Sequence, residues 1–433
     1  MSDLTHYTSA FGAFTGTALS KELLPLRKSA MERFTATGFP TTRNEEWKYT
    51  NIAPVAGGRF APAIGESTID KTVFQQFLIA GTDVHLIVFV NGSLSASLSN
   101  FGSMPVGVIA GRLSEHAGHP AVKSHLGDVA GTSAGAMVEL HTAFLSEGAF
   151  LFVPQGIVVE KPIHFLFINN GINGETLISP RNLFIAEERS SVQVIESFHS
   201  VGTAHTCFTN AVTQVHTGRN AHLDLTKVQV ENTASYHIGY TAADQEAGSE
   251  FHITTITLDG AIVRNNLNIR LNGEHSNTWL YGLYCLNGSQ LVDNHSLVDH
   301  AVPNCNSNEL YKGIIDGKAQ GVFNGKIFVR KDAQKTNAYQ SNKNILLSDE
   351  ASMNTKPQLE IFADDVKCSH GTTTGQLDEE ALFYLRSRGI GEENARAFLN
   401  IAFAGDVIQK IAYEPLRLRM MELMERKLKG ESL

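Results

Sequence analysis

Short runs of alternating apolar and polar residues fill the chain from about residue 150 onward. The runs at 156–160, 164–168 and 191–195 each have the length of one strand, and Gly, Asn, Asp or Ser residues separate them from their neighbours. Few Asn-Gly or Asp-Gly hairpin signals lie between them. The pattern predicts a mainly β core of roughly 200 residues with no helix inside it.

The strand pattern also repeats along the chain. A small or polar residue opens an apolar alternation at Ser191, Ala221, Ser249, Ser276 and Ser307, so the successive offsets are 30, 28, 27 and 31 residues. Such spacing is typical of solenoids and propellers, and a propeller blade needs about 40 to 45 residues. The shorter period favours a β-helix in which each repeat forms one coil.

Helical spacing is confined to the regions before and after this core. The expected helices cover 20–37, 135–146, 378–389, 392–404 and about 406–429. Ser20 and Asp378 are the expected N-caps, and Gly38, Gly389 and Gly405 are the expected stops. We expect these helical segments to cap both ends of the β-helix, because its end coils otherwise expose unpaired backbone.

These patterns divide the chain into three regions. Residues 1–149 form a mixed, partly helical N-terminal region, 150–374 form the β-helix core, and 375–433 form a C-terminal helical domain. The polar stretch 43–50 is interpreted as a loop that its tryptophan anchors.

Charge and composition narrow the class of protein. Lys and Arg number 35 against 44 Asp and Glu, which gives a net charge of −9 and disfavours binding to a phosphate backbone. No apolar run approaches the roughly 18 to 20 residues that span a bilayer, and the N-terminus lacks a basic start followed by an apolar stretch. We therefore expect a soluble, cytoplasmic protein without nucleic-acid or membrane partners.

Motifs for common metal, ATP and acyl chemistry are missing or incomplete. The four cysteines form no CxxC pair, which excludes a zinc ribbon, a ferredoxin-type cluster site within the chain and a dense disulfide framework. The stretch 321–327 is not a Walker A motif, because its spacing is wrong and no Ser or Thr follows the lysine. The GxSxG sequence at 131–135 lacks a preceding strand and is interpreted as a flexible loop.

Histidines of the β region are interpreted mostly as solvated or hydrogen-bonded strand residues rather than as a metal cluster. They are His199, His205, His216, His222, His237 and His252.

Cys368 and His370 are the candidate metal ligands. At positions i and i+2 of a strand they project from one face, where a thiolate and an imidazole could bind a soft or borderline metal or cluster iron. Lys367 is expected to help lower the pKa of the thiol. Two ligands do not complete a site, so a purely structural Cys and His remains the alternative to a site that distant histidines or another subunit complete.

Several motifs resemble the SufB/SufD family of iron–sulfur cluster assembly scaffolds. They lie at 344–371, 321–326, 332–336 and 382–390. The stretch 46–50 and the Lys-Cys-Ser-His-Gly form at 367–371 are similar to the SufD branch, and a cysteine-rich N-terminal motif of many SufB proteins is missing. Thr372 occupies the position at which some members carry a second cysteine, and this weakens any model that requires two thiols at the site.

The resemblance implies a right-handed parallel β-helix flanked by helices and a non-catalytic scaffold subunit. It implies pairing with SufB through the β-helices and docking of the SufC ATPase on the C-terminal helices. The lateral surface that pairs with SufB could also pair with itself, so we expect a homodimer when the chain is isolated. His370 would be a shared ligand of a transient iron–sulfur cluster at the SufB interface, with Cys368 as an auxiliary ligand and no cofactor held stably by this chain alone. The expected SufC-docking residues are Leu382, Tyr384, Arg386, Arg388, Ala397, Phe398 and Ile401.

Two alternatives share the architecture. A β-helix enzyme that acts on polysaccharide would require a groove of carboxylates and basic residues and an export signal, and the sequence shows neither. A homodimeric SufB-like paralogue would use the lateral surface of the β-helix for self-association.

Overall fold

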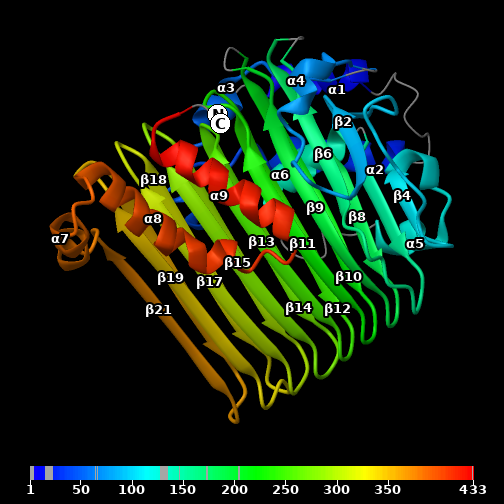
Figure 1. Ribbon diagram of the computed structural model, residues 1–433. Coiled ribbons are helices and arrows are strands. Elements are labelled where there is room, and N and C mark those ends of the chain that lie inside the picture. Colours follow the sequence, from blue (N-terminus) through cyan, green and yellow to red (C-terminus); the bar gives the residue numbers. More distant parts are fainter. Residues whose placement is uncertain are drawn as a thin grey trace.

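A parallel β-solenoid of about eight turns forms the centre of the protein (Figure 1). The structure is a computed structural model and describes residues 4–14, 23–63, 65, 67–126, 135–145, 147–171, 174–202, 205–431 and 433. Successive strands alternate between two sheets, so each turn adds one strand to each sheet. The mainly β fold with flanking helices is confirmed.

Sheet A has the order β20-β18-β16-β14-β12-β10-β8-β5-β4, and sheet B has the order β21-β19-β17-β15-β13-β11-β9-β6-β2-β3. The strands of sheet A are β4 (Ile109–Arg112), β5 (Ala149–Val153), β8 (Arg181–Ala186), β10 (Cys207–Thr217), β12 (Tyr236–Gln245), β14 (Ile262–Leu271), β16 (Leu291–His300), β18 (Gln320–Val329) and β20 (Ser352–Ile361), with β1 (Ala61–Pro62) and β7 (Thr176–Ile178) beside them. The strands of sheet B are β2 (His85–Val90), β3 (Ser93–Leu94), β6 (Ile163–Asn169), β9 (Ser191–Ser200), β11 (His222–Val230), β13 (Glu250–Asp259), β15 (Asn277–Leu286), β17 (Asn306–Ile315), β19 (Asn337–Leu346) and β21 (Lys367–Gly375).

The repeat in the sequence corresponds to one turn of the solenoid. Each small or polar residue that opens a repeat lies within one residue of the start of a strand of sheet B. The hydroxyls of Ser249 and Ser276 donate to the carbonyls of Glu246 and Gly273, three residues earlier, and so close the turn before the strand. The period is therefore set by turn chemistry as well as by strand length.

The run at 156–160 is not a strand, contrary to expectation. Val158 forms only an isolated parallel bridge with Ser191. Pro154 and Pro162 flank the run, and proline has no N–H to donate to a ladder, so the pairing stays short.

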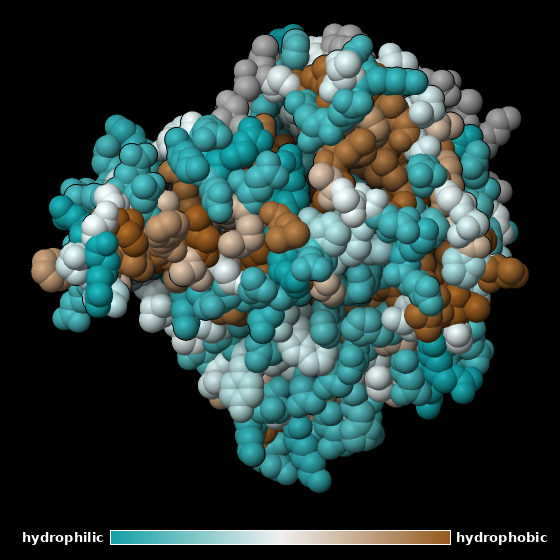
Figure 2. All heavy atoms as spheres, in the orientation of Figure 1, coloured by the Kyte–Doolittle hydropathy of each residue, from teal (hydrophilic) through white to brown (hydrophobic). Residues whose placement is uncertain are grey.

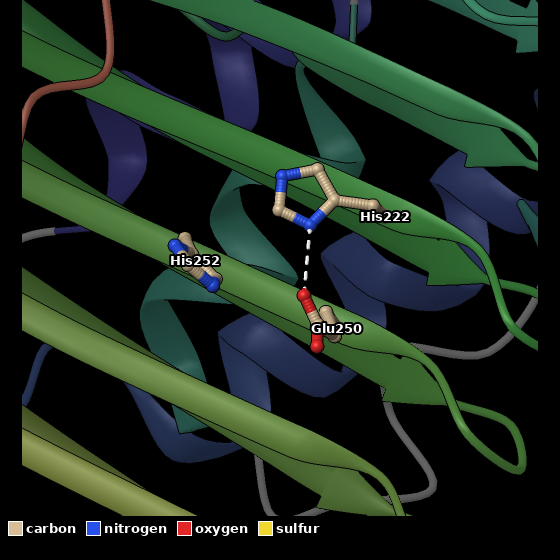
Figure 3. Close-up of side chains that lie close together, drawn as sticks. All are labelled: His222, Glu250 and His252. Carbon is tan, nitrogen blue, oxygen red and sulfur yellow. Dashed lines mark ion pairs between the residues drawn. The ribbon is translucent and has the colours of Figure 1, made fainter.

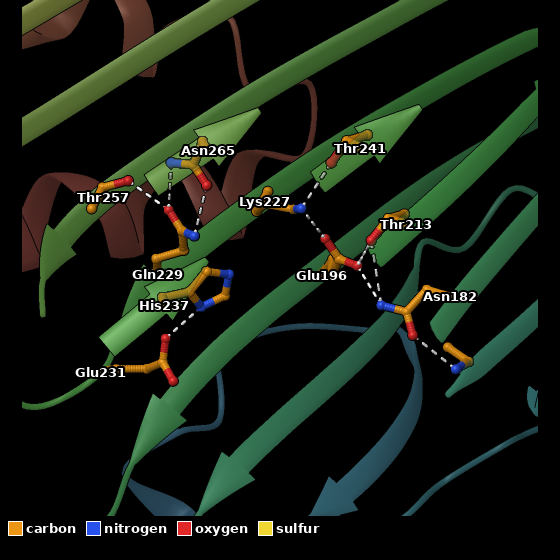
Figure 4. A network of polar contacts seen from close by, with 11 residues as sticks. Asn182, Glu196, Thr213, Lys227, Gln229, Glu231, His237, Thr241, Thr257 and Asn265 are labelled. Carbon is orange, nitrogen blue, oxygen red and sulfur yellow. Dashed lines mark hydrogen bonds and ion pairs between the residues drawn. The ribbon is translucent and has the colours of Figure 1, made fainter. Parts of the chain in front are cut away.

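The interior between the sheets is partly apolar and partly polar. Inward-facing Leu, Ile, Val and Phe side chains form the main core. Other inward positions form a buried polar network (Figure 4), in which Lys227 Nζ lies 3.0 Å from Glu196 Oε2 and Gln229 and Asn265 exchange hydrogen bonds through their amides. Paired in this way, buried polar groups avoid the cost of desolvation without a partner.

The N-terminal helices lie mostly on the outside of the first turns. They are α1 (Thr5–Phe14), α2 (Leu24–Thr37), η1 (Glu45–Trp47), α3 (Ala53–Gly57), α4 (Lys71–Gln75), η2 (Leu113–His116), α5 (Pro120–His125) and α6 (Gly135–Ala143). The predicted stop at Gly38 is confirmed by its φ of 69°, which suits glycine. The expected cap Ser20 and residues 131–134 of the GxSxG sequence lie outside the described residues.

The C-terminal helices are α7 (Glu379–Ser387), α8 (Glu392–Ile408) and α9 (Glu414–Leu428). Asp378 caps α7 as predicted, because its carboxylate accepts from the backbone N–H groups of Glu380 and Ala381 at 2.9 and 3.1 Å. None of the helices that the structure describes combines the length and apolarity required to cross a bilayer.

The predicted stop of the second C-terminal helix at Gly405 is wrong. α8 continues to Ile408, because Val407 and Ile408 are buried against sheet B, and this burial outweighs the roughly 1 kcal/mol that a helical glycine costs. α9 consequently starts at Glu414 rather than near Asp406, whose carboxylate pairs with Lys312 of β17.

The C-terminal helices do not cap the solenoid, which corrects a further expectation. α8 and α9 run back across the outer face of sheet B, over β13, β15 and β17 (Figure 1). β20 and β21 are therefore the last strands of their sheets, and most side chains of β21 are exposed. The solenoid therefore ends in a turn that no described helix covers, formed by β20 and β21 and called the open turn below.

Candidate functional site

The open turn carries both predicted ligands on one face of β21. Cys368 and His370 pair in register with Ala338 and Gln340 of β19, which are buried. This face of the ladder therefore points toward the solenoid interior, and in β21 it faces the open end. His370 is exposed and Cys368 is half-buried.

Cys368 is a protonated thiol at neutral pH. It packs beside the small apolar cluster that contains Ile327 and Ala338, and this partial burial raises the pKa of the thiol above its ordinary value. The expected lowering by Lys367 is wrong, because successive residues of a strand point to opposite faces and Lys367 is exposed. A metal would have to displace the proton before Cys368 could bind as a thiolate.

We expect Cys368 to be the only thiol that iodoacetamide modifies in the native protein. Cys207, Cys285 and Cys305 are buried, and burial raises the pKa of each, to about 12 for Cys207 and Cys285. Mass spectrometry should show one adduct on the native chain and adducts on all four cysteines after denaturation. A native-state adduct on any of the buried thiols would contradict this picture.

A buried polar column leads from His370 into the core. Glu309 of β17, Gln340 of β19 and His370 of β21 follow one another in register. Gln340 Nε2 donates to Glu309 Oε2 at 2.7 Å, and burial raises the pKa of Glu309 to about 7. Glu309, whose carboxyl has a pKa near neutral pH, thus lies two strands further into the solenoid than the exposed His370.

Glu309 and Asp224 should each contribute stability at about pH 5 that is lost as the pH rises to about 8. Burial raises the pKa of Glu309 and of Asp224 to about 7, so at these two groups the folded chain keeps protons that the unfolded chain has released. Each group contributes on the order of 3 kcal/mol between the two limits. Relative to the wild type, the free energy of unfolding of Glu309→Gln should rise by about 3 kcal/mol between pH 5 and pH 8 in urea unfolding, whereas the exposed control Glu274→Gln should show no such pH-dependent difference. A difference between Glu309→Gln and the wild type that does not change with pH would contradict the assignment.

A second candidate surface lies on α7 and α8. Figure 2 shows hydrophobic residues gathered among polar ones where these helices project from the solenoid. Phe383 and Phe398 are 74% and 54% exposed, and Tyr384 is also exposed. Together with Arg386 and Arg388 these residues are called the α7–α8 surface below.

The predicted docking residues fall into three groups in the structure. Tyr384, Phe398, Arg386 and Arg388 are exposed, and Ala397 and Ile401 are half-buried. Leu382 is only 3% exposed, so its side chain packs inside the chain and is not available to a partner. The sequence analysis did not select Phe383. Its position was a usable signal, because the residue that follows a buried leucine in an amphipathic helix faces away from the core.

Two histidines that were interpreted as ordinary strand residues belong to a cluster. His222 and His252 lie with Glu250 on the outer face of sheet B, and their ligand atoms all lie within 4.8 Å of one another. The sequence alone could not predict this cluster, because the register between β11 and β13 brings the two histidines together.

Comparison with known proteins gives matches along most of the chain. The family model of the SufBD core domain of SUF-system FeS cluster assembly matches residues 167–403, and the model of the SufBD N-terminal region matches residues 5–165. The chain belongs to the SufBD family. It is therefore a member of an iron–sulfur cluster assembly family, and this membership favours cluster assembly over the polysaccharide alternative.

Full-length relatives agree with the SufBD assignment. The iron–sulfur cluster assembly protein SufD of Escherichia coli is 31% identical, over 94% of this chain and 93% of that protein. An iron–sulfur cluster assembly SufBD family protein of Synechocystis is 32% identical, over 92% of this chain and 90% of its own. The chloroplastic protein ABCI7 of Arabidopsis thaliana is 30% identical, over 92% and 84%.

Proposed function

We propose that the chain is a non-catalytic scaffold subunit of iron–sulfur cluster assembly that pairs with a SufB subunit and docks the SufC ATPase. The observation that supports the proposal most is the open turn of the solenoid. There, β20 and β21 end their sheets, and β21 carries the exposed side chain of His370 and the half-buried side chain of Cys368.

Two exposed edge strands favour a partner that adds strands to both sheets. β20 and β21 present N–H and C=O groups that no further strand among the described residues pairs. A second solenoid could continue the ladders, and Phe362, which is 60% exposed beside the edge, would add apolar contact. In the absence of SufB, the same edge should join two copies of this chain in a symmetric homodimer.

The ligand set at the open turn requires completion by the partner. One thiol and one imidazole supply at most two of the ligands that a cluster needs. Among the described residues, the group that meets metal-ligand geometry lies on the outer face of sheet B rather than at this turn. We therefore assign His370, which is exposed, as the shared ligand of a transient cluster, and Cys368 as an auxiliary ligand. The cluster is cargo that the assembled complex releases.

ATP hydrolysis belongs to the partner in this scheme, because the sequence contains no Walker A motif. The α7–α8 surface is the proposed docking site for SufC. Exposed aromatic rings beside Arg386 and Arg388 have the composition of a protein-binding surface.

Phe398→Asp should weaken SufC binding at least about tenfold, because a charge at the centre of an apolar interface must be desolvated without a partner. Titration of SufC against the wild-type and variant chains measures the effect. Leu418→Asp is the matched control, since Leu418 is a similarly exposed apolar residue on α9, outside the α7–α8 surface. Equal binding of SufC to both variants and to the wild type would place the docking site elsewhere.

Co-purification of the chain with SufB and SufC tests the proposed function as a whole. The expected result is one complex that contains all three chains. If the chain assembles with neither partner and remains a homodimer at every ratio, the scaffold function is wrong.

A further inference from the structure

The outer face of sheet B carries a group of metal-ligand side chains far from the open turn. In parallel register, His222 of β11 lies opposite Glu250 of β13, and Asp224 lies opposite His252. The residues between them pack into the apolar core, so all four face outward. The result is a two-by-two grid of potential ligands on neighbouring strands, three of which are drawn in Figure 3.

The geometry of three of these side chains suits one ion. His222 Nδ1 lies 3.3 Å from Glu250 Oε2, and Figure 3 shows the ring and the carboxylate pointing toward each other. The ring centroids of His222 and His252 are 5.1 Å apart. Two ligand atoms that bind a tetrahedral ion at about 2 Å lie roughly 3.3 Å apart, so small side-chain rotations would bring all three atoms onto one ion.

His252 has a ring nitrogen that lacks a partner. Its Nε2 is buried and makes no hydrogen bond with any described residue, whereas Nδ1 lies 3.9 Å from Asp224 Oδ2. An imidazole with a carboxyl group near one ring nitrogen and the other ring nitrogen free is a common arrangement of a metal-binding histidine.

We propose that His222, Glu250 and His252 bind a divalent transition-metal ion of borderline softness, such as Zn²⁺ or Fe²⁺. Two imidazoles and one carboxylate match the donor preference of these ions and leave coordination positions open for water or an exchangeable ligand. Asp224 lies on the other side of His252, with its Oδ2 atom 3.9 Å from Nδ1. The site uses β11 and β13 alone, so it does not depend on the proposed scaffold function or on the open turn.

Trp279 can report on an ion at this site. Its ring centroid lies 4.2 Å from that of His252, and the chain has only one other tryptophan. That residue, Trp47, packs on Arg264 of β14, in the opposite sheet. Paramagnetic Co²⁺ should therefore quench the fluorescence of Trp279 and leave that of Trp47 unchanged.

The test titrates Co²⁺ into two single-tryptophan chains. Trp47→Phe leaves Trp279 as the reporter and should show saturable quenching that Zn²⁺ reverses. Trp279→Phe leaves Trp47 and should show none. Equal quenching of both reporters, or none of either, would overturn the proposal.

Ligand variants in the Trp47→Phe background identify the side chains. His222→Gln, Glu250→Gln and His252→Gln keep the side-chain size and should each weaken Co²⁺ binding at least about tenfold. His275→Asn is the matched control, because His275 is an exposed histidine with a positive φ that asparagine tolerates, and its affinity should be that of the wild type. His370→Ala should also be unchanged, which separates this site from the open turn.

Two further measurements keep the test decisive. Thermal unfolding without metal should be the same for Glu250→Gln and the parent chain, so that weaker binding cannot be assigned to misfolding. Anomalous diffraction at the zinc edge should place the ion among the three side chains. Wild-type affinity in all three ligand variants, or an ion bound only elsewhere, would overturn the site.

Discussion

Asp293→Asn should lower the free energy of unfolding by about 3 kcal/mol or more. Asp293 of β16 is buried on the outer side of sheet A, and it pairs there with Arg264 of β14, which is buried as well. The hydroxyl of Thr50 donates to the same carboxylate, and His295 Nε2 lies 2.9 Å from it. Removal of the charge leaves a buried guanidinium without its counter-ion, and that costs more than the lost contacts alone.

The same carboxylate predicts an acid dependence. Burial alone would raise the pKa of Asp293, but Arg264 and His295 outweigh it and lower the pKa to about 2. Between about pH 4 and pH 2 the folded chain binds fewer protons here than the unfolded chain. The stabilisation is therefore complete above about pH 4 and is lost as the pH falls through this window, and Asp293→Asn should lack this loss.

Urea unfolding at pH 7 and pH 3 measures both effects. Asp83→Asn is the matched control, because Asp83 pairs with Lys161 at 2.8 Å but both side chains are largely exposed. Such a surface pair contributes about 0 to 1 kcal/mol. Equal destabilisation by the two substitutions would show that burial of the Asp293 pair does not govern its effect.

His370→Ala should reduce the iron–sulfur cluster formed on the complex with SufB and SufC at least about tenfold, because it removes an iron ligand. His370 is exposed on the last strand and supports no part of the core, so the fold and the complex should persist. Anaerobic reconstitution with iron and sulfide, followed by absorbance and iron analysis, measures the yield.

Thr374→Ala is the control for that experiment, since Thr374 lies four residues along the same strand and shares its face. Cys368→Ala should have the smaller effect expected of an auxiliary ligand. If His370→Ala builds as much cluster as the wild type, the chain is a structural and ATPase-docking subunit, and the cluster chemistry belongs to SufB.

The sequence predicts the repeat well and the helix packing poorly, for a physical reason. Strand periodicity and the serines that close the turns are local signals, and each turn uses them again. The predicted end of a helix at Gly405 also relied on a local signal. It was wrong because α8 continues, so that Val407 and Ile408 are buried against sheet B. The expectation that α8 and α9 cap the solenoid failed in the same way, because their direction is set by contacts with β13, β15 and β17, which lie far earlier in the chain.

Contacts between side chains of different elements could not be predicted from the sequence either. The sequence indicated an anchored loop at 43–50, but it could not show that Trp47 packs on the guanidinium of Arg264, 3.9 Å from the ring centroid. It placed Cys368 and His370 on one face, because two residues of one strand suffice for that. His222 and Glu250 needed the register of two strands, which alternation alone does not specify.

Pulsed EPR tests the central claim, that the open turn supplies a cluster ligand, most directly. The sample is the reduced, reconstituted complex in which only this chain carries ¹⁵N-labelled histidine. A ¹⁵N hyperfine coupling to the cluster that disappears in His370→Ala is the predicted result. A cluster signal of full intensity without coupling to the labelled nitrogen would contradict the claim.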